Sequence, residues 1–443
     1  MKYLTFILLL LSISMLAADP VIYPTTTLAE NFGATWCGAC QFALDGLDVL
    51  DSETNNSEVV FARLLTESGD YTTLEIDARF GYYEVLGLPA VIFNGKTRVD
   101  GSGDGIADGS LYQDAMQNYL YLGSPIRMSM PTFVNATGMV SVDIEMLNPD
   151  LSFEDAKLIY YLIEDDIDDE LTHIVRDIIT QDIDIAYTGS VVEYDTTFDM
   201  DYSWNVNNLW AVAFVQLQNQ SIIQSASSLP LPENLIQAAL PFDNTIYGPA
   251  NGQYESPAFY IYNLGAADSY TRHIEVISAP DDWYFNYCDI DGNCYPGSMQ
   301  IPFTLGEGEY AAYDLNLSIG SDGIAYFNFV INSDLMGEYK IPFYYSTATA
   351  NADALAPSTL SVVKAYPNPF SAGLNIEIES AKDVSTSRIE IFNIKGQKLK
   401  SIALKELRQG PNYLQVDLSE LSNGVYFYRL EGSQSTGKLL KIK

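Results

Sequence analysis

The first quarter of the chain alternates between two hydrophobic periods. Residues 28–33, 58–65 and 89–101 show the apolar runs or alternation that predict β-strands, the last of them folded back as a hairpin. Residues 40–51, 73–87 and 110–123 place apolar side chains three or four positions apart, which predicts helices. Strands that alternate with helices predict an α/β domain over residues 19–124.

Beyond this region the helical period disappears. Strand patterns recur at residues 139–147, 156–165, 191–200 and 209–218, and again at 258–265, 272–278, 283–289, 313–320 and 325–333. Turn residues separate these segments. We therefore expect two β-sandwich, Ig-like domains at residues 125–233 and 238–350, so that the chain as a whole is a multidomain protein of α/β plus all-β class.

The distribution of charge marks a further boundary. Residues 361–443 carry a net charge of +4, whereas residues 1–360 carry −40. A small-residue linker at 351–361 lies at this break, and four strand patterns follow it, so residues 362–443 are predicted to form a small C-terminal β-sandwich. The formal net charge of −36 argues against nucleic acid and anionic lipid as partners, because both attract positive surfaces.

The N-terminus has the composition of a secretory signal peptide. A lysine at position 2 precedes a run of roughly a dozen apolar residues, and small residues follow at Ala17 and Ala18. We expect residues 1–18 to be removed and the mature protein to be exported. Disulfides persist in such an environment.

The four cysteines form two closely spaced pairs, Cys37 with Cys40 and Cys288 with Cys294. An even number in an exported chain predicts disulfides. A four-cysteine zinc site is the alternative, but it would have to bring together two unlike segments that are far apart in the sequence. We predict no cofactor and no metal.

The segment between Cys288 and Cys294 offers a second alternative to a simple disulfide turn. Asp289, Asp291 and Asn293 have the spacing of the start of a calcium loop. The bidentate glutamate that closes such a loop is missing, and Asp-Gly is a turn signal. A tight turn closed by a structural disulfide is therefore the preferred interpretation, and calcium binding stays open.

The spacing of Cys37 and Cys40 is the one that a reactive dithiol requires. A cysteine at a helix N-terminus faces unpaired N–H groups and the positive end of the helix dipole, which lower its thiol pKa. The second cysteine, one turn later, is close enough to resolve a mixed disulfide. Cys37 is the candidate nucleophile, Cys40 the resolving thiol, and Trp36 the neighbour that shapes access.

The segments "FGATWCGAC" and "GLPAVIFNG" resemble the thioredoxin superfamily. The resemblance implies a thioredoxin-like fold for residues 19–124. It implies that Pro89 is a cis-proline and that the Leu88 backbone binds the substrate. It also implies that the partners are exported proteins with thiols or disulfides.

Asn31 departs from the thioredoxin pattern. In thioredoxins a buried aspartate occupies this position and helps to deprotonate the resolving thiol, and Glu30 beside it is expected to face the other side of the strand. Two hypotheses therefore remain. The protein is a thiol–disulfide oxidoreductase of unknown redox direction, or it is a non-enzymatic surface binding or adhesion scaffold with a structural Cys37–Cys40 disulfide.

Two further resemblances extend beyond the first domain. "AENFGATWCGAC" and "LTHIVRDII" resemble outer-membrane-associated thioredoxin-like proteins of Bacteroidetes type. The resemblance implies that His173 and Arg176 anchor a partner or the neighbouring domain; the alternative is that they form a structural pair.

"AYPNPF", "IEIFNIKGQKL" and "LSNGVYFYRLEG" resemble the type A sorting domain of type IX secretion substrates. This resemblance implies the type IX secretion machinery as a partner and secretion across the outer membrane, to the cell surface or the extracellular space.

Overall fold

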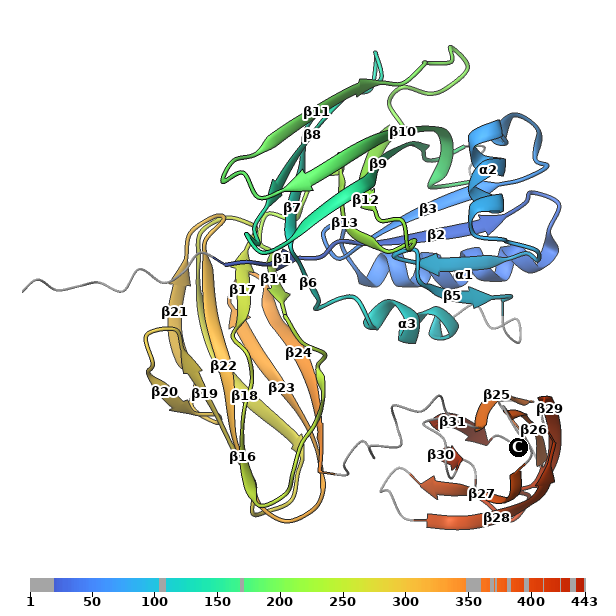
Figure 1. The fold of residues 1–443 in the computed structure, drawn as a ribbon, viewed down its shortest axis with the longest axis vertical. Helices are drawn as coiled ribbons and strands as arrows, with labels where there is room; N and C mark the ends of the chain where they lie inside the picture. Colours follow the sequence, from blue (N-terminus) through green and yellow to red (C-terminus); the bar gives the residue numbers. More distant parts are fainter. Residues whose placement is uncertain are drawn as a thin grey trace, which may run out of the picture. The chain divides into compact units, whose positions relative to one another are not determined.

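One mixed sheet of eight strands runs through the N-terminal half of the protein (Figure 1). Its strand order is β13-β12-β9-β10-β3-β2-β4-β5. The strands are β2 (Thr27–Gly33), β3 (Val59–Leu65), β4 (Ala90–Phe93), β5 (Thr97–Asp100), β9 (Ser152–Glu164), β10 (Ile174–Ala186), β12 (Leu209–Gln216) and β13 (Ile222–Ser227). Smaller sheets accompany it: β1 (Tyr23–Pro24) pairs with β6 (Gly123–Ser124), and β7 (Ile126–Val134), β8 (Met139–Met146) and β11 (Val192–Thr197) form a three-stranded sheet.

The computed structural model describes residues 20–102, 109–167 and 171–347, and in the C-terminal part residues 360–366, 370, 373–380, 384–393, 398–408, 410–422, 424–430 and 436–441. The predicted signal peptide at residues 1–18 and most of the predicted linker at 351–361 lie outside the described residues.

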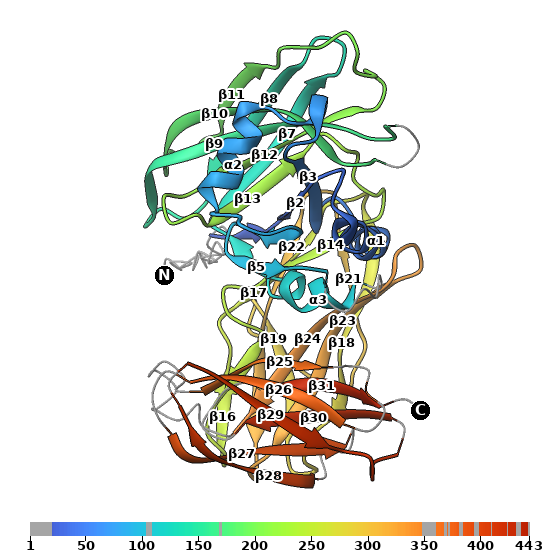
Figure 2. The same cartoon turned by 90° about the vertical axis from the view of Figure 1, so that its right-hand side faces the viewer.

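Helices cover both faces of the β2–β5 part of this sheet (Figures 1 and 2). Helices α1 (Gly38–Glu53) and α3 (Ser110–Gln117) pack on one face, and α2 (Leu74–Tyr82) packs on the other. Thr73 caps α2 by accepting a hydrogen bond from the Ile76 N–H at 3.2 Å. The sequence predicts this helix as far as residue 87, but it ends at Tyr82, because Glu84 adopts a φ of +51° that no helix continues.

The large sheet passes through the domain boundary that we expected at residue 124. Ile174 of β10 pairs with Arg63 of β3, and the Arg63 N–H donates to the His173 carbonyl at 2.8 Å. The core on the α2 face combines Val60 of β3 with residues such as Tyr161 of β9. Helix α2 has only nine residues. It leaves apolar surface on this face, and side chains of β9, β10 and β12 pack against that surface.

The β4–β5 hairpin, which precedes residue 124, meets the β12–β13 hairpin, which follows it, at Gly95. This glycine has a φ of +69°, and a Cβ added to it would lie 1.9 Å from the Gln220 carbonyl oxygen. Gly69 has a similar φ of +65° but nothing within 4 Å of an added Cβ, so it is the matched control. Alanine at Gly69 should cost about 1–2 kcal/mol of unfolding free energy from the left-handed backbone alone.

We expect Gly95→Ala to cost about 1–3 kcal/mol more than Gly69→Ala, because the β4–β5 and β12–β13 turns would have to separate. Urea unfolding followed by tryptophan fluorescence measures both values, since all four tryptophans lie before residue 348. Equal losses in the two variants would show that the two hairpins do not need this close contact.

A β-sandwich follows at residues 236–346, made of a six-stranded and a five-stranded sheet, and is called the second sandwich below. The first contains β14 (Ile236–Ala239), β16 (Gly252–Glu255), β17 (Phe259–Asn263), β19 (Tyr284–Asp289), β20 (Cys294–Pro296) and β22 (Tyr310–Ile319). The second contains β15 (Thr245–Tyr247), β18 (Asp268–Ser278), β21 (Ile301–Leu305), β23 (Ile324–Ser333) and β24 (Gly337–Ser346). Aromatic rings join the sheets, as where Phe259 meets Phe329 edge to face at 5.2 Å between ring centroids.

The chain divides into two compact units, Met1–Thr347 and Ala348–Lys443. The C-terminal unit is a small sandwich of its own, with a three-stranded and a four-stranded sheet around a buried hydrophobic core. Its strands are β25 (Leu360–Tyr366), β26 (Gly373–Ser380), β27 (Val384–Asn393), β28 (Lys398–Leu407), β29 (Gly410–Asp417), β30 (Gly424–Leu430) and β31 (Thr436–Lys441).

Candidate functional site

Cys37 and Cys40 form a disulfide at the N-terminus of α1. Cys37 is the N-cap residue, and its sulfur accepts a hydrogen bond from the Cys40 N–H at 3.2 Å. The two cysteine residues differ in exposure. Cys37 is half-buried, whereas only 4% of Cys40 is exposed, and the Trp36 side chain beside them is 62% exposed. A thiol or disulfide from another molecule therefore reaches Cys37 more easily than Cys40.

Pro89 lies next to this pair at the start of β4. The register of β2 and β4 pairs Phe32 with Ala90, so its continuation by one residue sets Gly33 beside Pro89. A Cβ added to Gly33 would lie 3.5 Å from the Cys40 sulfur, which places that sulfur against the end of β2. The Leu88–Pro89 peptide bond is cis. Within the described residues, neither the N–H nor the C=O of Leu88 forms a hydrogen bond.

Asn31 lies two residues before Gly33 on β2, on the same face as α1 and Cys40. It is buried, and its side-chain oxygen has no hydrogen-bond partner among the described residues. A neutral amide at this position accepts no proton from Cys40. Glu30 points to the opposite face, as the alternation along a strand requires.

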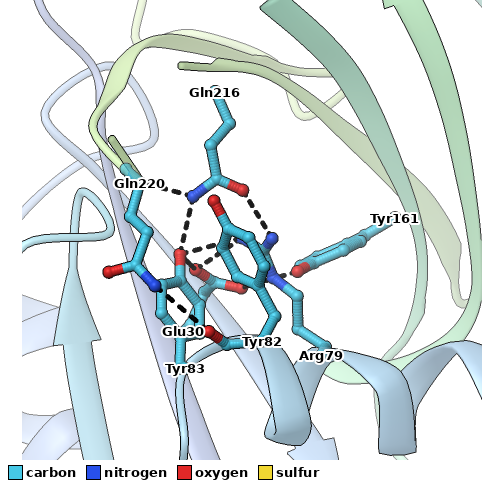
Figure 3. A network of polar contacts seen from close by, with 7 residues as sticks. All are labelled: Glu30, Arg79, Tyr82, Tyr83, Tyr161, Gln216 and Gln220. Carbon is cyan, nitrogen blue, oxygen red and sulfur yellow. Dashed lines mark hydrogen bonds and ion pairs between the residues drawn. The ribbon is translucent and has the colours of Figure 1, made fainter. Parts of the chain in front are cut away.

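Glu30 is the centre of a buried polar network that the sequence did not reveal (Figure 3). Its carboxylate, which is not exposed, accepts from Arg79 Nε at 2.8 Å and from Arg79 Nη2 at 3.0 Å. It also accepts from the hydroxyls of Tyr83 at 2.8 Å and Tyr161 at 2.6 Å. Gln216 of β12 completes the network through Arg79 and Tyr83.

The electrostatics of this network favour the ion pair. Burial opposes the charge on Arg79, but attraction to Glu30 outweighs it, so the pKa of Arg79 lies above its ordinary value. Burial, followed by the charge of Glu30, raises the pKa of Tyr83. Tyr83 therefore stays protonated and donates. The only signal in the sequence was a charged residue inside the apolar strand 28–33.

His173 and Arg176 both reach toward the N-terminal segment. The His173 ring nitrogens lie 3.3 Å from Asp51 Oδ2 at the end of α1 and 3.2 Å from Asp165 Oδ1. The contact with Asp165 is poorly aligned for a hydrogen bond and acts as charge attraction. The Arg176 guanidinium lies 5.0 Å from the ring centre of Tyr71. Both roles considered for His173 and Arg176, an anchor for a partner or the neighbouring domain and a structural pair, stay predictions.

The charge on His173 should make stability fall at high pH. Burial disfavours the charged ring, but Asp165 and Asp51 outweigh burial and raise its pKa from 6.5 to about 9. A folded pKa above the unfolded value stabilises the protein below pH 6.5, and this stabilisation is lost as the pH rises through 9. The contribution is up to about 3 kcal/mol.

We expect the difference in unfolding free energy between the natural protein and His173→Gln to shrink from pH 6 to pH 10. Chemical unfolding at several pH values measures it. His273→Gln is the control, because this second histidine shows no contact with a carboxylate within ion-pair distance among the described residues. A difference that is constant with pH would contradict a charged His173.

Cys288 and Cys294 form the second disulfide, so the cysteines do not share a zinc site. The Asp289 carboxylate holds the turn between them by accepting hydrogen bonds from the backbone N–H groups of Asp291 and Asn293. Gly292 occupies the left-handed region with a φ of +78°. These contacts are those of a tight turn. Among the described residues, no group of three or more histidine, cysteine or acidic side chains is arranged to hold a metal ion.

Comparison with known proteins identifies the C-terminal unit. Residues 364–442 match the family described as secretion system C-terminal sorting domain. The chain is therefore a protein that carries a type IX secretion sorting domain, which implies contact with that secretion machinery. It is exported across the outer membrane to the cell surface or the extracellular space. In the described residues, no helix is both long enough and apolar enough to span a membrane.

The solved structures that match the chain are only distantly similar to it. No curated protein matches the chain. Latent PorU from Porphyromonas gingivalis is 12% identical with a TM-score of 0.18, and the match covers 78% of this chain but only 39% of that one. The secreted serine protease VesC from Vibrio cholerae is 11% identical with a TM-score of 0.22, over 66% of this chain and 73% of that one. Similarities this distant support no argument about this protein.

Proposed function

We propose that the protein is an exported thiol–disulfide exchange protein whose reactive pair is Cys37 and Cys40. The observation that carries the proposal is the unequal exposure of the two cysteine residues at the start of α1, with Cys37 half-buried and Cys40 buried. An exchange protein needs this asymmetry, because the outer sulfur meets the substrate and the inner one resolves the product. Its substrates would be thiols or disulfides of other exported proteins.

A thioredoxin-like fold for residues 19–124 is part of the proposal. Strands β3, β2, β4 and β5 are adjacent in that order, with β3 parallel to β2 and the other two pairs antiparallel. Helices α1 and α3 lie on one face and α2 on the other. This order and these directions are typical of the thioredoxin fold. The later strands of the same sheet would then be an addition to that fold.

In the reducing direction, the Cys37 thiolate attacks one sulfur of a substrate disulfide and releases the other as a thiolate. The Cys40 thiolate then attacks Cys37 in the mixed disulfide, which releases the second substrate thiolate and restores the Cys37–Cys40 bond. The reverse sequence oxidises a substrate dithiol. The unpaired backbone of Leu88 is suited to bind an extended segment of the substrate, and the exposed Trp36 ring is suited to contact it.

The reduction potential of the mature protein tests this function. Equilibration with a series of glutathione ratios, together with turnover of a peptide disulfide, gives both the potential and the rate. A potential near or above about −200 mV with turnover would indicate an oxidant or isomerase, and one near about −270 mV a reductase. The absence of turnover at any ratio would overturn the proposal.

A scaffold with a structural Cys37–Cys40 disulfide is the second candidate. Asn31 favours it, because no carboxylate lies at this position beneath α1 to take the proton of Cys40. In that case the disulfide would be inert, and the β-sandwiches would carry the binding function.

A further inference from the structure

A polar cavity lies between the N-terminal α/β region and the second sandwich. It has a volume of about 250 Å³ and lies between the C-terminal end of α3 and the segment that leads into β15. Its lining includes five polar or aromatic residues, Gln117, Asn118, Tyr121, Phe242 and Asp243. The site is far in sequence from Cys37 and plays no part in the proposed thiol chemistry.

The cavity presents hydrogen-bonding groups that the protein itself leaves unused. Gln117 and Asn118 are exposed, and their amide groups form no hydrogen bond within the described residues. Each amide offers donors and an acceptor, and the Asp243 carboxylate adds acceptors. Only one oxygen of Asp243 is engaged, by the Thr245 N–H at 2.8 Å.

Two aromatic rings in the lining are held in place. The Tyr121 hydroxyl donates to the Lys340 carbonyl at 3.2 Å. Phe242 stacks on Phe343, with ring centroids 6.3 Å apart and an angle of 26° between the planes. Rings that are already fixed bind the apolar face of a ligand at a low cost in conformational entropy.

The chemistry of the lining selects one class of ligand. No lysine or arginine is among the lining residues, so a phosphate or carboxylate would find no counter-charge. The cavity is smaller than the roughly 300–1,000 Å³ of pockets for drug-sized molecules, which suits a single ring. Paired amides, a carboxylate and aromatic rings match a compact, neutral molecule with hydroxyl groups on its rim and C–H groups on its faces.

We propose that this cavity binds a sugar ring of a neutral glycan. The amides of Gln117 and Asn118 and the carboxylate of Asp243 would pair with vicinal hydroxyls, and Tyr121 or Phe242 would contact the C–H face. This binding function is separate from exchange at Cys37. It gives the exported protein a means of holding a carbohydrate surface.

The outer face of the five-stranded sheet extends the site. Thr245 lines the cavity and pairs in register with Tyr344 of the adjacent strand. The Tyr344 ring lies 6.2 Å from that of Tyr247 and 5.1 Å from that of Tyr326, and the latter two are 54% and 51% exposed. These three tyrosines offer contacts for further sugar units, so the ligand is an oligosaccharide.

The test uses the mature full-length chain. An array of neutral glycans, with the mono- and disaccharide units of any bound glycan then titrated by calorimetry, identifies the probe and its affinity. The variant Gln117→Ala with Asn118→Ala removes the free amides, and Gln113→Ala on the same helix is the matched control. All three positions are exposed, so the variants should fold.

We expect at least one neutral glycan to bind, and the double variant to weaken binding by at least about tenfold while Gln113→Ala leaves it unchanged. Tyr247→Ala should weaken binding of the longer glycans and spare the monosaccharide. No binding of any neutral glycan at about 1 mM, or binding that the double variant does not change, would overturn the inference. Binding of a peptide in the cavity in place of every glycan would overturn it as well.

Discussion

Replacement of Cys37 by serine is expected to abolish turnover of a peptide disulfide, a loss of at least about 10³-fold. In the proposed mechanism Cys37 is the cysteine that a substrate reaches, so without it no mixed disulfide would form. Replacement of Cys40 should act at the later step, because this buried residue is the proposed resolving thiol. Cys40→Ser should therefore accumulate a mixed disulfide with the substrate, visible by mass spectrometry.

A matched control is available in the same chain. Cys288→Ser combined with Cys294→Ser removes the other disulfide, which closes a tight turn in the second sandwich. This variant should keep the exchange activity. Turnover that survives in Cys37→Ser, or a mixed disulfide that forms through Cys40 alone, would contradict the assignment of roles. Loss of turnover in all of the cysteine variants would point to misfolding.

The second large effect is expected on stability. Glu30→Ala should lower the free energy of unfolding of the N-terminal unit by about 3–5 kcal/mol. The substitution leaves the Arg79 guanidinium, only 7% exposed, without its counter-charge, and it leaves the hydroxyls of Tyr83 and Tyr161 without their acceptor. Urea unfolding followed by tryptophan fluorescence reports on this unit alone.

An exposed ion pair in the same sheet is the control for this prediction. Lys157 and Asp182 link β9 and β10, and their side chains are 50% and 81% exposed. Asp182→Ala should cost no more than about 1 kcal/mol, because water screens and solvates the pair. If Glu30→Ala cost no more than Asp182→Ala, the Glu30 network would not hold the N-terminal segment against β9 and β12.

The network also bears on the proposed exchange site. Glu30 precedes Asn31, which lies beneath α1 and its disulfide. The Glu30 network fixes one face of β2 while the other face supports Cys40, which lies against Gly33. A rigid β2 would hold Cys40 in a constant position relative to Cys37. The proposed exchange by Cys37 would therefore depend on residues more than a hundred positions away in the sequence, such as Tyr161 and Gln216.

Local sequence determined several elements of this protein. The apolar runs at 28–33 and 58–65 became β2 and β3, and the helical spacing after Cys37 became α1. The two cysteine pairs and the sorting domain at 364–442 were also readable from the chain. These features depend on neighbours within a few residues, where side-chain spacing sets strand or helix, or on a compact motif.

Tertiary structure decided the rest. Residue 124 separated two patterns, an α/β pattern and a β pattern, yet the strands on both sides share one sheet and one core. The partners of Glu30 come from α2, from Tyr83 just after it and from β9, while β12 joins the network through Arg79. The partner of Asp51 is His173. Periodicity reports which face of an element is apolar but not which distant element will cover it. Only packing of β9, β10 and β12 against β2 and β3 brought these groups together, because the apolar surface that α2 leaves must be removed from water.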